Sequence, residues 1–192
     1  MKITITNSHD FDRQIKILEE QFKHYKRDIT FSIAQKDIDG FIISRENNEI
    51  HLIYGDLHYL FAGIESLLIG KKNYQLKPKF KRLGIMIDCA RNGVPNVSAL
   101  KRFVVNASFL GYSYVGLYLE DCLEVNNEPL FGYMRGRYTK SEIKEICEFS
   151  NMFGIEIIPY IQTLAHMENL FHHYIYVVDA KDVGNILKIG NE

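Results

Sequence analysis

Six polar residues in the middle of the chain have side chains that could do chemistry. Each follows one of three apolar runs that we expect to be strands, and they are Asp88, Arg91, Glu120, Asp121, Gln162 and His166. Parallel α/β folds build their active sites at the carboxyl ends of strands, where such side chains meet. The spacing therefore predicts one polar site at the end of a parallel sheet.

Two interpretations are open for Arg91. Its guanidinium can donate several hydrogen bonds in a fixed fork, to sugar hydroxyls or to a carboxylate. It could equally form a structural ion pair with Asp88 or Glu120. Position alone does not separate a ligand-binding arginine from a structural one.

The other candidate side chains also have two interpretations each. Glu120 and Asp121 could accept hydrogen bonds from hydroxyls, or they could pair with Arg135 or Arg137. His166 could line the site, or it could be a structural histidine with its own partners.

A loop over residues 126–138 mixes aromatic and basic side chains. They are Phe131, Tyr133, Met134, Arg135, Arg137 and Tyr138. Such a loop could form a platform for a sugar ring, or it could pack on its own aromatic side chains. The sequence leaves both possibilities open.

Motifs for several other chemistries are absent from the sequence. Residues 89–95, after the first apolar run, lack the glycine patterns of dinucleotide-binding and P-loop folds. No G-x-S-x-G or H-E-x-x-H motif occurs. The adjacent His172 and His173 would not share a helix face. We therefore expect no cofactor and no metal ion.

Composition narrows the class of protein. Hydrophobic residues make up 46% of the 192 residues, and the net charge of −1 argues against a general affinity for nucleic acid. No run approaches the roughly 18 apolar residues of a membrane span, and the amino terminus does not read as a signal peptide. Cys89, Cys122 and Cys147 are too far apart for a zinc motif and fit a reduced, cytoplasmic protein.

Residues 1–70 are expected to form a small domain of order β-α-β-β-β-α. The expected strands cover residues 2–6, 29–33, 40–44 and 49–54, and the amphipathic helices cover residues 10–25 and 57–68. Asn47 and Asn48 favour a hairpin turn, and Asp56 can cap the second helix. One apolar face per helix predicts that both helices cover one face of an antiparallel sheet.

Residues 71–82 are expected to be a linker. They contain Lys71, Lys72, Lys77, Lys79, Lys81 and Arg82, with Pro78 among them. A solvated linker is the favoured interpretation, and a nucleic-acid-binding patch is the alternative.

A second domain is expected over residues 83–192. Strands are predicted at 83–87, 114–119 and 155–161, and helices at 98–110 and 139–153. The continuous apolar run of the first strand predicts burial on both faces, and Thr139 and Glu142 form a capping box. Two β-α-β crossovers predict a parallel sheet. After His166 the pattern weakens to a helical turn at 167–174 and a short strand at 185–189.

Four sequence runs in this second domain resemble a known family. They are GIMIDCARN from Gly84, LYLED from Leu117, FGYMRGRYT from Phe131 and IPYIQTLAH from Ile158. They are similar to the start of the catalytic barrel of family 20 glycoside hydrolases, the exo-acting β-N-acetylhexosaminidases, and in particular to their bacterial cytoplasmic N-acetylglucosaminidase branch. The resemblance covers residues 80–190 well, and residues 1–70 only in the pattern of elements.

The resemblance implies a fold and an activity. The fold is α/β, a small α+β domain followed by the first three to four βα units of an incomplete TIM-type (β/α)8 barrel. About 110 residues follow Leu83, whereas a closed barrel needs roughly 250. The activity is removal of a terminal β-linked N-acetylhexosamine by a retaining mechanism in which the acetamido group of the substrate is the nucleophile.

The resemblance also implies roles for individual residues. Arg91 matches an arginine that binds hydroxyls of the terminal sugar, and His166 matches a histidine that lines the site. Asp88, Glu120 and Asp121 are further substrate-binding candidates. The family's catalytic Asp-Glu pair follows the fourth strand, and this sequence contains no Asp-Glu dipeptide.

We therefore expect no catalytic residue in this chain and no turnover by it alone, with the Asp-Glu pair beyond Glu192. The expected partners are a terminal N-acetylhexosamine, of gluco or galacto configuration, and a second copy that pairs through the open barrel edge. A non-catalytic carbohydrate-binding or assembly module is the alternative. A complete small α/β enzyme of another kind is disfavoured by the missing motifs.

Overall fold

The computed structural model describes residues 1–91, 93–163 and 166. Its contacts divide the chain into two compact units. The first unit comprises Met1–Ile85, Lys101–Val115 and Glu148–Glu156, and the second unit comprises Met86–Leu100, Gly116–Cys147 and the residues from Ile157 onward. Within the described residues, no helix is both long and apolar enough to cross a membrane.

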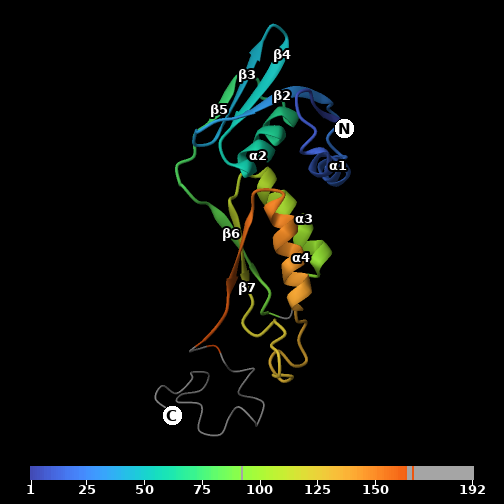
Figure 1. Ribbon diagram of the computed structural model, residues 1–192, viewed down its shortest axis with the longest axis vertical. Helices are drawn as coiled ribbons and strands as arrows, with labels where there is room; N and C mark the ends of the chain where they lie inside the picture. Colours follow the sequence, from blue (N-terminus) through green and yellow to red (C-terminus); the bar gives the residue numbers. More distant parts are fainter. Residues whose placement is uncertain (92, 164–165, 167–192) are drawn as a thin grey trace. The chain divides into compact units, whose positions relative to one another are not determined.

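A five-stranded sheet lies in the first unit, with the order β1-β2-β4-β3-β5 (Figure 1). Its strands are β1 (Ile3–Ile5), β2 (Ile29–Gln35), β3 (Phe41–Glu46), β4 (Glu49–Tyr54) and β5 (Tyr74–Leu76). β1 pairs with β2 and β2 with β4 in parallel, whereas β3 is antiparallel to β4 and β5. The prediction of an antiparallel sheet is therefore confirmed for β3 with its two neighbours and wrong for the pairs β1–β2 and β2–β4, so the sheet is mixed. The helix α1 (Asp12–Gln21) lies between β1 and β2 in sequence and lets these strands run in parallel.

The second helix, α2 (Leu57–Leu68), contributes much of the core of this unit. Leu60 and Ile64 are fully buried, as is Leu52 of the sheet. Gly63 allows close approach, because a Cβ there would lie 2.5 Å from Leu52 Cδ1. Asp56 occupies the N-cap position but makes no side-chain cap hydrogen bond, so only part of the capping prediction is confirmed.

The turn between β3 and β4 forms as predicted. Asn47 and Asn48 adopt φ of 48° and 71°, the left-handed conformation that two-residue hairpin turns require. By contrast, α1 is shorter than the predicted helix over residues 10–25.

The basic segment at 71–82 contains regular structure that the sequence did not predict. β5 pairs with β3, with Leu76 opposite Phe41. Lys71 lies 5.0 Å from the centroid of the Tyr74 ring, and Arg82 forms an ion pair with Glu156. Two of the basic side chains of the segment, Lys71 and Arg82, therefore have partners within the chain. The domain bounds at 70 and 82 stay a prediction.

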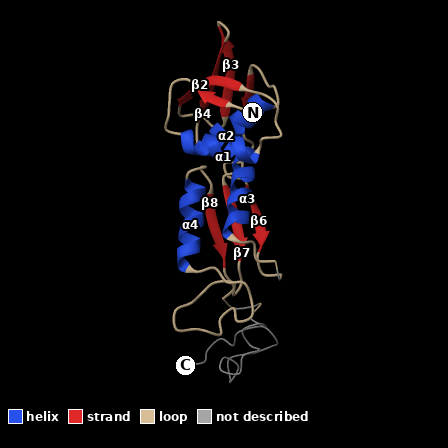
Figure 2. Cartoon of the chain, turned by 90° about the vertical axis from the view of Figure 1, so that its right-hand side faces the viewer, coloured by secondary structure: helices blue, strands red, loops and turns tan. Residues whose placement is uncertain are grey.

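A second sheet has three strands in the order β6-β7-β8 (Figure 2). They are β6 (Gly84–Asp88), β7 (Tyr114–Tyr118) and β8 (Glu156–Tyr160), with helices α3 (Val97–Phe109) and α4 (Lys140–Asn151) between them in sequence. Ser113 N donates to Leu83 O at 2.7 Å, and Cys89 N donates to Tyr118 O at 2.9 Å. The chain just before β6 thus bonds to the chain just before β7, and the ends of the two strands bond to each other. This confirms the predicted parallel sheet.

The capping box at the start of α4 is confirmed. Thr139 N donates to Glu142 Oε2 at 2.8 Å, and Glu142 N donates to Thr139 Oγ1 at 3.1 Å. Both bonds satisfy backbone donors that the first turn of a helix would otherwise leave unpaired.

The prediction that the first strand of this sheet is buried on both faces is wrong for the described residues. Ile85 and Met86 of β6 are 43% and 53% exposed, whereas Val115 and Leu117 of β7 are 1% exposed. β6 is at the edge of the three strands and β7 is at their centre, so only β7 has a neighbour on both sides. The elements predicted at 167–174 and 185–189 lie outside the described residues.

Candidate functional site

The ends of the three parallel strands lie next to one another in the second unit. Cys89, just after β6, bonds to Tyr118 of β7, and Leu119 N donates to Tyr160 O of β8 at 3.0 Å. The residues that follow each strand therefore emerge at one edge of the sheet, as the sequence predicts.

Glu120 and Asp121 occupy a tight turn after β7. Cys122 N donates to Leu119 O at 2.8 Å and closes the turn. Glu120 adopts φ of 49°, in the left-handed region that costs a residue other than glycine about 1–3 kcal/mol. Both residues are nevertheless buried, at 7% and 8% exposure. The turn thus holds two carboxylates in a fixed place below the surface.

Arg135 supplies the positive charge for both carboxylates. Its Nη1 lies 2.9 Å from Asp121 Oδ1 and 3.6 Å from Glu120 Oε2. The same guanidinium donates to the carbonyl of Ala90, and only 11% of the side chain is exposed. Of the two arginines considered from the sequence, Arg135 forms the structural pair.

Arg137 stabilises the loop itself. Its Nη1 donates to Phe131 O at 2.9 Å and to Pro129 O at 3.3 Å. Gly132 has φ of 66°, and a Cβ there would lie 2.2 Å from Asp121 O. The loop at 126–138 is therefore packed against the turn after β7, although Tyr133 and Met134 remain 52% and 87% exposed.

Arg91 combines a structural contact with an exposed guanidinium. Its Nη1 donates to Glu120 Oε1 at 2.9 Å, and its guanidinium carbon lies 5.7 Å from the centroid of the Tyr118 ring. The hydrogen bond and charge of Glu120 raise the pKa of Arg91, with a smaller contribution from the charge of Asp88. The side chain is still 59% exposed, so a ligand can reach its other donors.

The remaining predicted residues have separate positions. Asp88 is exposed, and its Oδ1 accepts a hydrogen bond from Ala90 N at 2.8 Å, which fixes the turn after β6. Gln162 Nε2 donates to Tyr118 Oη at 2.6 Å. His166 is exposed and adopts φ of 58°. Arg91, Glu120 and Asp121 thus belong to one network through Arg135, and among the described contacts none joins His166 to it.

Two buried thiols lie beside this network. Burial raises the pKa of Cys89 to about 11 and also raises that of Cys122, whose Sγ lies 3.4 Å from Cys89 O. A thiol that stays protonated at neutral pH is a poor nucleophile. Both cysteines are also fully buried, so they contribute packing at the turn.

The described part of the chain contains no cluster of side chains that could coordinate a metal ion. No group of three or more histidine, cysteine, aspartate or glutamate side chains there could hold an ion.

The sequence indicated Arg135 only as a possible partner of Glu120 and Asp121, and it did not indicate Tyr118 at all. Arg135 bridges two strand ends, and Tyr118 lies under Arg91 and bonds to Gln162. One signal was available for Tyr118, which is an aromatic residue two positions before Glu120. A loop arginine that lies 15 and 14 residues along the chain from Glu120 and Asp121 has no comparable signal.

Solved structures show the same fold. A family 20 exo β-N-acetylglucosaminidase from Vibrio harveyi, in complex with N-acetylglucosamine, matches with a TM-score of 0.74 and 15% identity, over 97% of this chain and 38% of that one. The chain resembles the family 20 β-N-acetylhexosaminidases. A β-N-acetylhexosaminidase from Bacteroides fragilis matches with a TM-score of 0.69 and 19% identity, over 97% of this chain and 46% of that one.

Sequence comparison agrees with the resemblance to family 20. A β-hexosaminidase from Akkermansia muciniphila is 28% identical over 116 residues, which cover 51% of this chain and 23% of that protein. No family model matches the chain. The chain thus spans less than half of each of these three relatives, and the match fits an amino-terminal portion of them. The resemblance predicted from the sequence is confirmed, including an α/β fold with a small sheet domain and a parallel sheet with helices.

Proposed function

We propose that this chain carries the sugar-positioning part of a family 20 β-N-acetylhexosaminidase. The observation that carries the proposal is Arg91, which stands at the end of β6 with an exposed guanidinium fixed on one side by Glu120. A guanidinium held in this way can donate to two neighbouring hydroxyls of a sugar without losing side-chain freedom on binding. The substrate is a terminal β-linked N-acetylhexosamine.

The carboxylates behind Arg91 act on the arginine and not on the glycosidic bond. Arg135 lies within 3.6 Å of both Glu120 and Asp121, so the two carboxylates are already paired with a guanidinium that a leaving oxygen would have to displace. General acid catalysis needs a proton donor beside the leaving oxygen and contributes roughly 10²–10⁴-fold in rate. Because the sequence has no Asp-Glu dipeptide, we propose that this polypeptide binds the sugar and does not cleave it.

In the retaining reaction of this family the substrate's acetamido oxygen attacks the anomeric carbon while an acid protonates the leaving oxygen. Arg91 would fix the position of the terminal sugar ring for this step. Asp88 and His166 would be further contacts to the sugar. We propose that β6 to β8 are the first strands of a (β/α)8 barrel, and that the free cysteines Cys89, Cys122 and Cys147 reflect a reducing, cytoplasmic compartment.

A titration with N-acetylglucosamine tests the binding function. Amide NMR resonances of residues 88–91 and 118–121 should shift in a saturable way, and Arg91→Ala should abolish these shifts. Arg45→Ala is the matched control, because Arg45 lies on β3 of the other unit. Unchanged resonances at both strand ends in the unsubstituted protein would contradict the proposal.

We also propose that the chain self-associates through the three-stranded sheet. Ile85, Met86, Tyr160 and Ile161, in or next to the outer strands β6 and β8, are 37–53% exposed among the described residues. Unpaired edge strands and exposed apolar side chains favour association. Light scattering at several concentrations should show a mass that rises with concentration. A monodisperse monomer throughout would exclude self-association and favour the reading of a complete module.

A further inference from the structure

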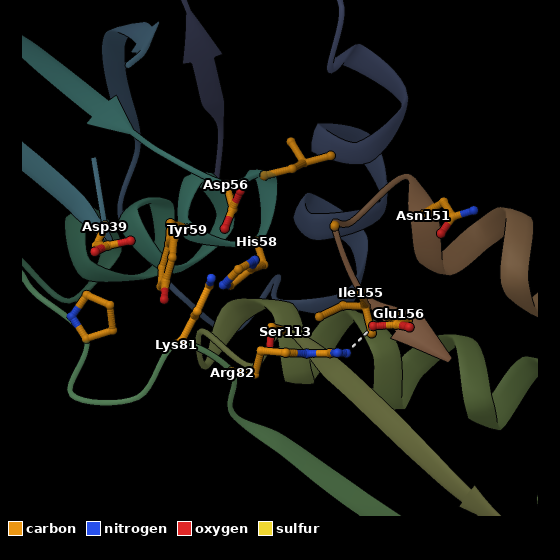
Figure 3. Close-up of a pocket in the computed structure, with 13 residues that line it drawn as sticks. Asp39, Asp56, His58, Tyr59, Lys81, Arg82, Ser113, Asn151, Ile155 and Glu156 are labelled. Atoms are coloured by element: carbon orange, nitrogen blue, oxygen red, sulfur yellow. Dashed lines mark hydrogen bonds and ion pairs between the residues drawn. The ribbon is translucent and has the colours of Figure 1, made fainter. Parts of the chain in front are cut away.

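A pocket of about 470 Å³ lies in the first unit, at the start of α2 (Figure 3). Its volume falls in the range of roughly 300–1,000 Å³ that small-molecule sites occupy. Asp56, His58 and Tyr59 line it from α2 and its N-cap, Lys81 and Arg82 from the segment before β6, and Glu156 from the start of β8. None of these residues belongs to the network around Arg91.

His58 is the unusual side chain in this pocket. It is 5% exposed, and its Nε2 is buried without a hydrogen-bond partner. Nearly all buried polar groups in native proteins have a partner, so an exception needs a cause. Burial lowers the pKa of His58, with the charge of Asp56 opposing the effect, so the ring is neutral at neutral pH. A neutral imidazole nitrogen can pair with a hydroxyl group.

The wall that carries His58 is fixed by backbone packing. Gly154 has φ of 67°, and a Cβ there would lie 2.5 Å from the backbone nitrogen of His58. The Tyr59 ring lies 4.0 Å from the His58 ring, measured between centroids. The first turn of α2 is thus held in place before any ligand arrives, which lowers the entropy cost of binding.

The charges of the pocket select the class of ligand. Arg82 pairs with Glu156, as Figure 3 shows, while Asp39, Asp56 and Lys81 line the same space. An anion would meet the two aspartates, and a cation would meet Lys81 and Arg82. A hydroxyl group both donates and accepts, so one polyhydroxylated molecule can use donors and acceptors on all sides.

We propose that this pocket binds a neutral polyhydroxylated ligand, a sugar of one or two rings, with His58 Nε2 as its buried contact. The inference is independent of the proposed hexosaminidase function, because the two sites share no residue.

Titration with D-glucose and with N-acetylglucosamine, followed by NMR, tests the pocket. The amide resonances of residues 56–59 and 154–156 and the Nε2 resonance of His58 should move together, with saturation in the millimolar range. His58→Phe should abolish these shifts, and Lys81→Ala and Asp39→Asn should each weaken binding roughly tenfold. The controls are Lys79→Ala and Asp37→Asn, which change neighbouring charges that do not line the pocket.

The outcomes are separable. Shifts confined to residues 88–91 and 118–121 would support the hexosaminidase proposal and overturn this one. Equal effects of Lys81→Ala and Lys79→Ala would also overturn it, and this comparison stands if His58→Phe fails to fold. A response to inorganic phosphate or to putrescine, with none to either sugar, would show a charged ligand and contradict the proposal.

Discussion

The two sheets of this protein differ in how far their apolar side chains are buried. In the five-stranded sheet, Leu52 is fully buried under α2. In the three-stranded sheet, Met86 of an outer strand is 53% exposed, while Glu120 and Asp121 at the strand ends are buried. The first sheet therefore has the features of a finished core. The second buries apolar side chains of β7 but leaves apolar side chains of β6 exposed, and charged groups are buried at its strand ends. The sugar site and the self-association that we propose would both use these features.

Arg135→Met should have the largest effect on stability. It leaves Asp121 buried without its positive partner and Glu120 with only the exposed Arg91, which should lower the free energy of unfolding by about 3–5 kcal/mol. Arg137→Met is the control, because Arg137 bonds only to loop carbonyls in the contacts described here and should cost about 1 kcal/mol. Urea unfolding measures both. Equal losses would mean that the buried charge pairing is not what stabilises this end of the sheet.

Truncation of one apolar side chain on α2, which packs on the first sheet, and of one in the second sheet should sharpen the comparison next. Leu60→Ala removes a fully buried side chain and should cost about 3 kcal/mol. Met86→Ala removes a half-exposed one and should cost roughly 0.5 kcal/mol in a dilute sample. The same unfolding experiment applies. A large loss for Met86→Ala that grows with protein concentration would show that a second copy covers this strand.

The capping box should contribute less. Thr139→Ala removes a cap at α4 and should cost about 1 kcal/mol. Bonds from the backbone and side chain of Thr139 lower the pKa of Glu142 from 4.5, so the charged carboxylate stabilises the fold above that pH. The stability difference between the unsubstituted protein and Glu142→Gln should therefore vanish as the pH falls through the lowered pKa. A difference that persists in acid would point to packing instead.

Arg91→Ala should have the smallest effect on stability and the clearest effect on binding. Its pair with Glu120 involves a largely exposed guanidinium, and solvent screening makes such pairs weak contributors to stability. Thermal unfolding should change little, whereas N-acetylglucosamine binding should be lost. A collapse of the fold with unchanged binding by the remaining folded protein would establish Arg91 as a structural residue.

Local signals in the sequence were enough for much of the fold. The hairpin at Asn47 and Asn48 and the capping box of Thr139 and Glu142 depend on neighbours within three residues, so the sequence specifies them directly. The direction of β2 against β4 and the pairing of β5 depend on contacts between distant segments, and propensity does not encode those.

The sequence predicted the position of the site better than it predicted the contacts within the site. Asp88, Arg91, Glu120 and Asp121 could be assigned to strand ends because apolar runs end there. The bridge from Arg135 to both carboxylates could not, because a packed loop brings it there and loop geometry has no period. Position alone also could not show that Arg91 is at once paired and exposed.

Our central proposal is that this chain positions an N-acetylhexosamine and does not cleave it. An assay of the repurified polypeptide with an aryl β-N-acetylglucosaminide tests that claim most directly. The account predicts no release of the aryl alcohol above the uncatalysed background. Turnover that survives repurification and is lost in Glu120→Gln or Asp121→Asn would contradict it and would assign the catalytic carboxylates to the turn after β7.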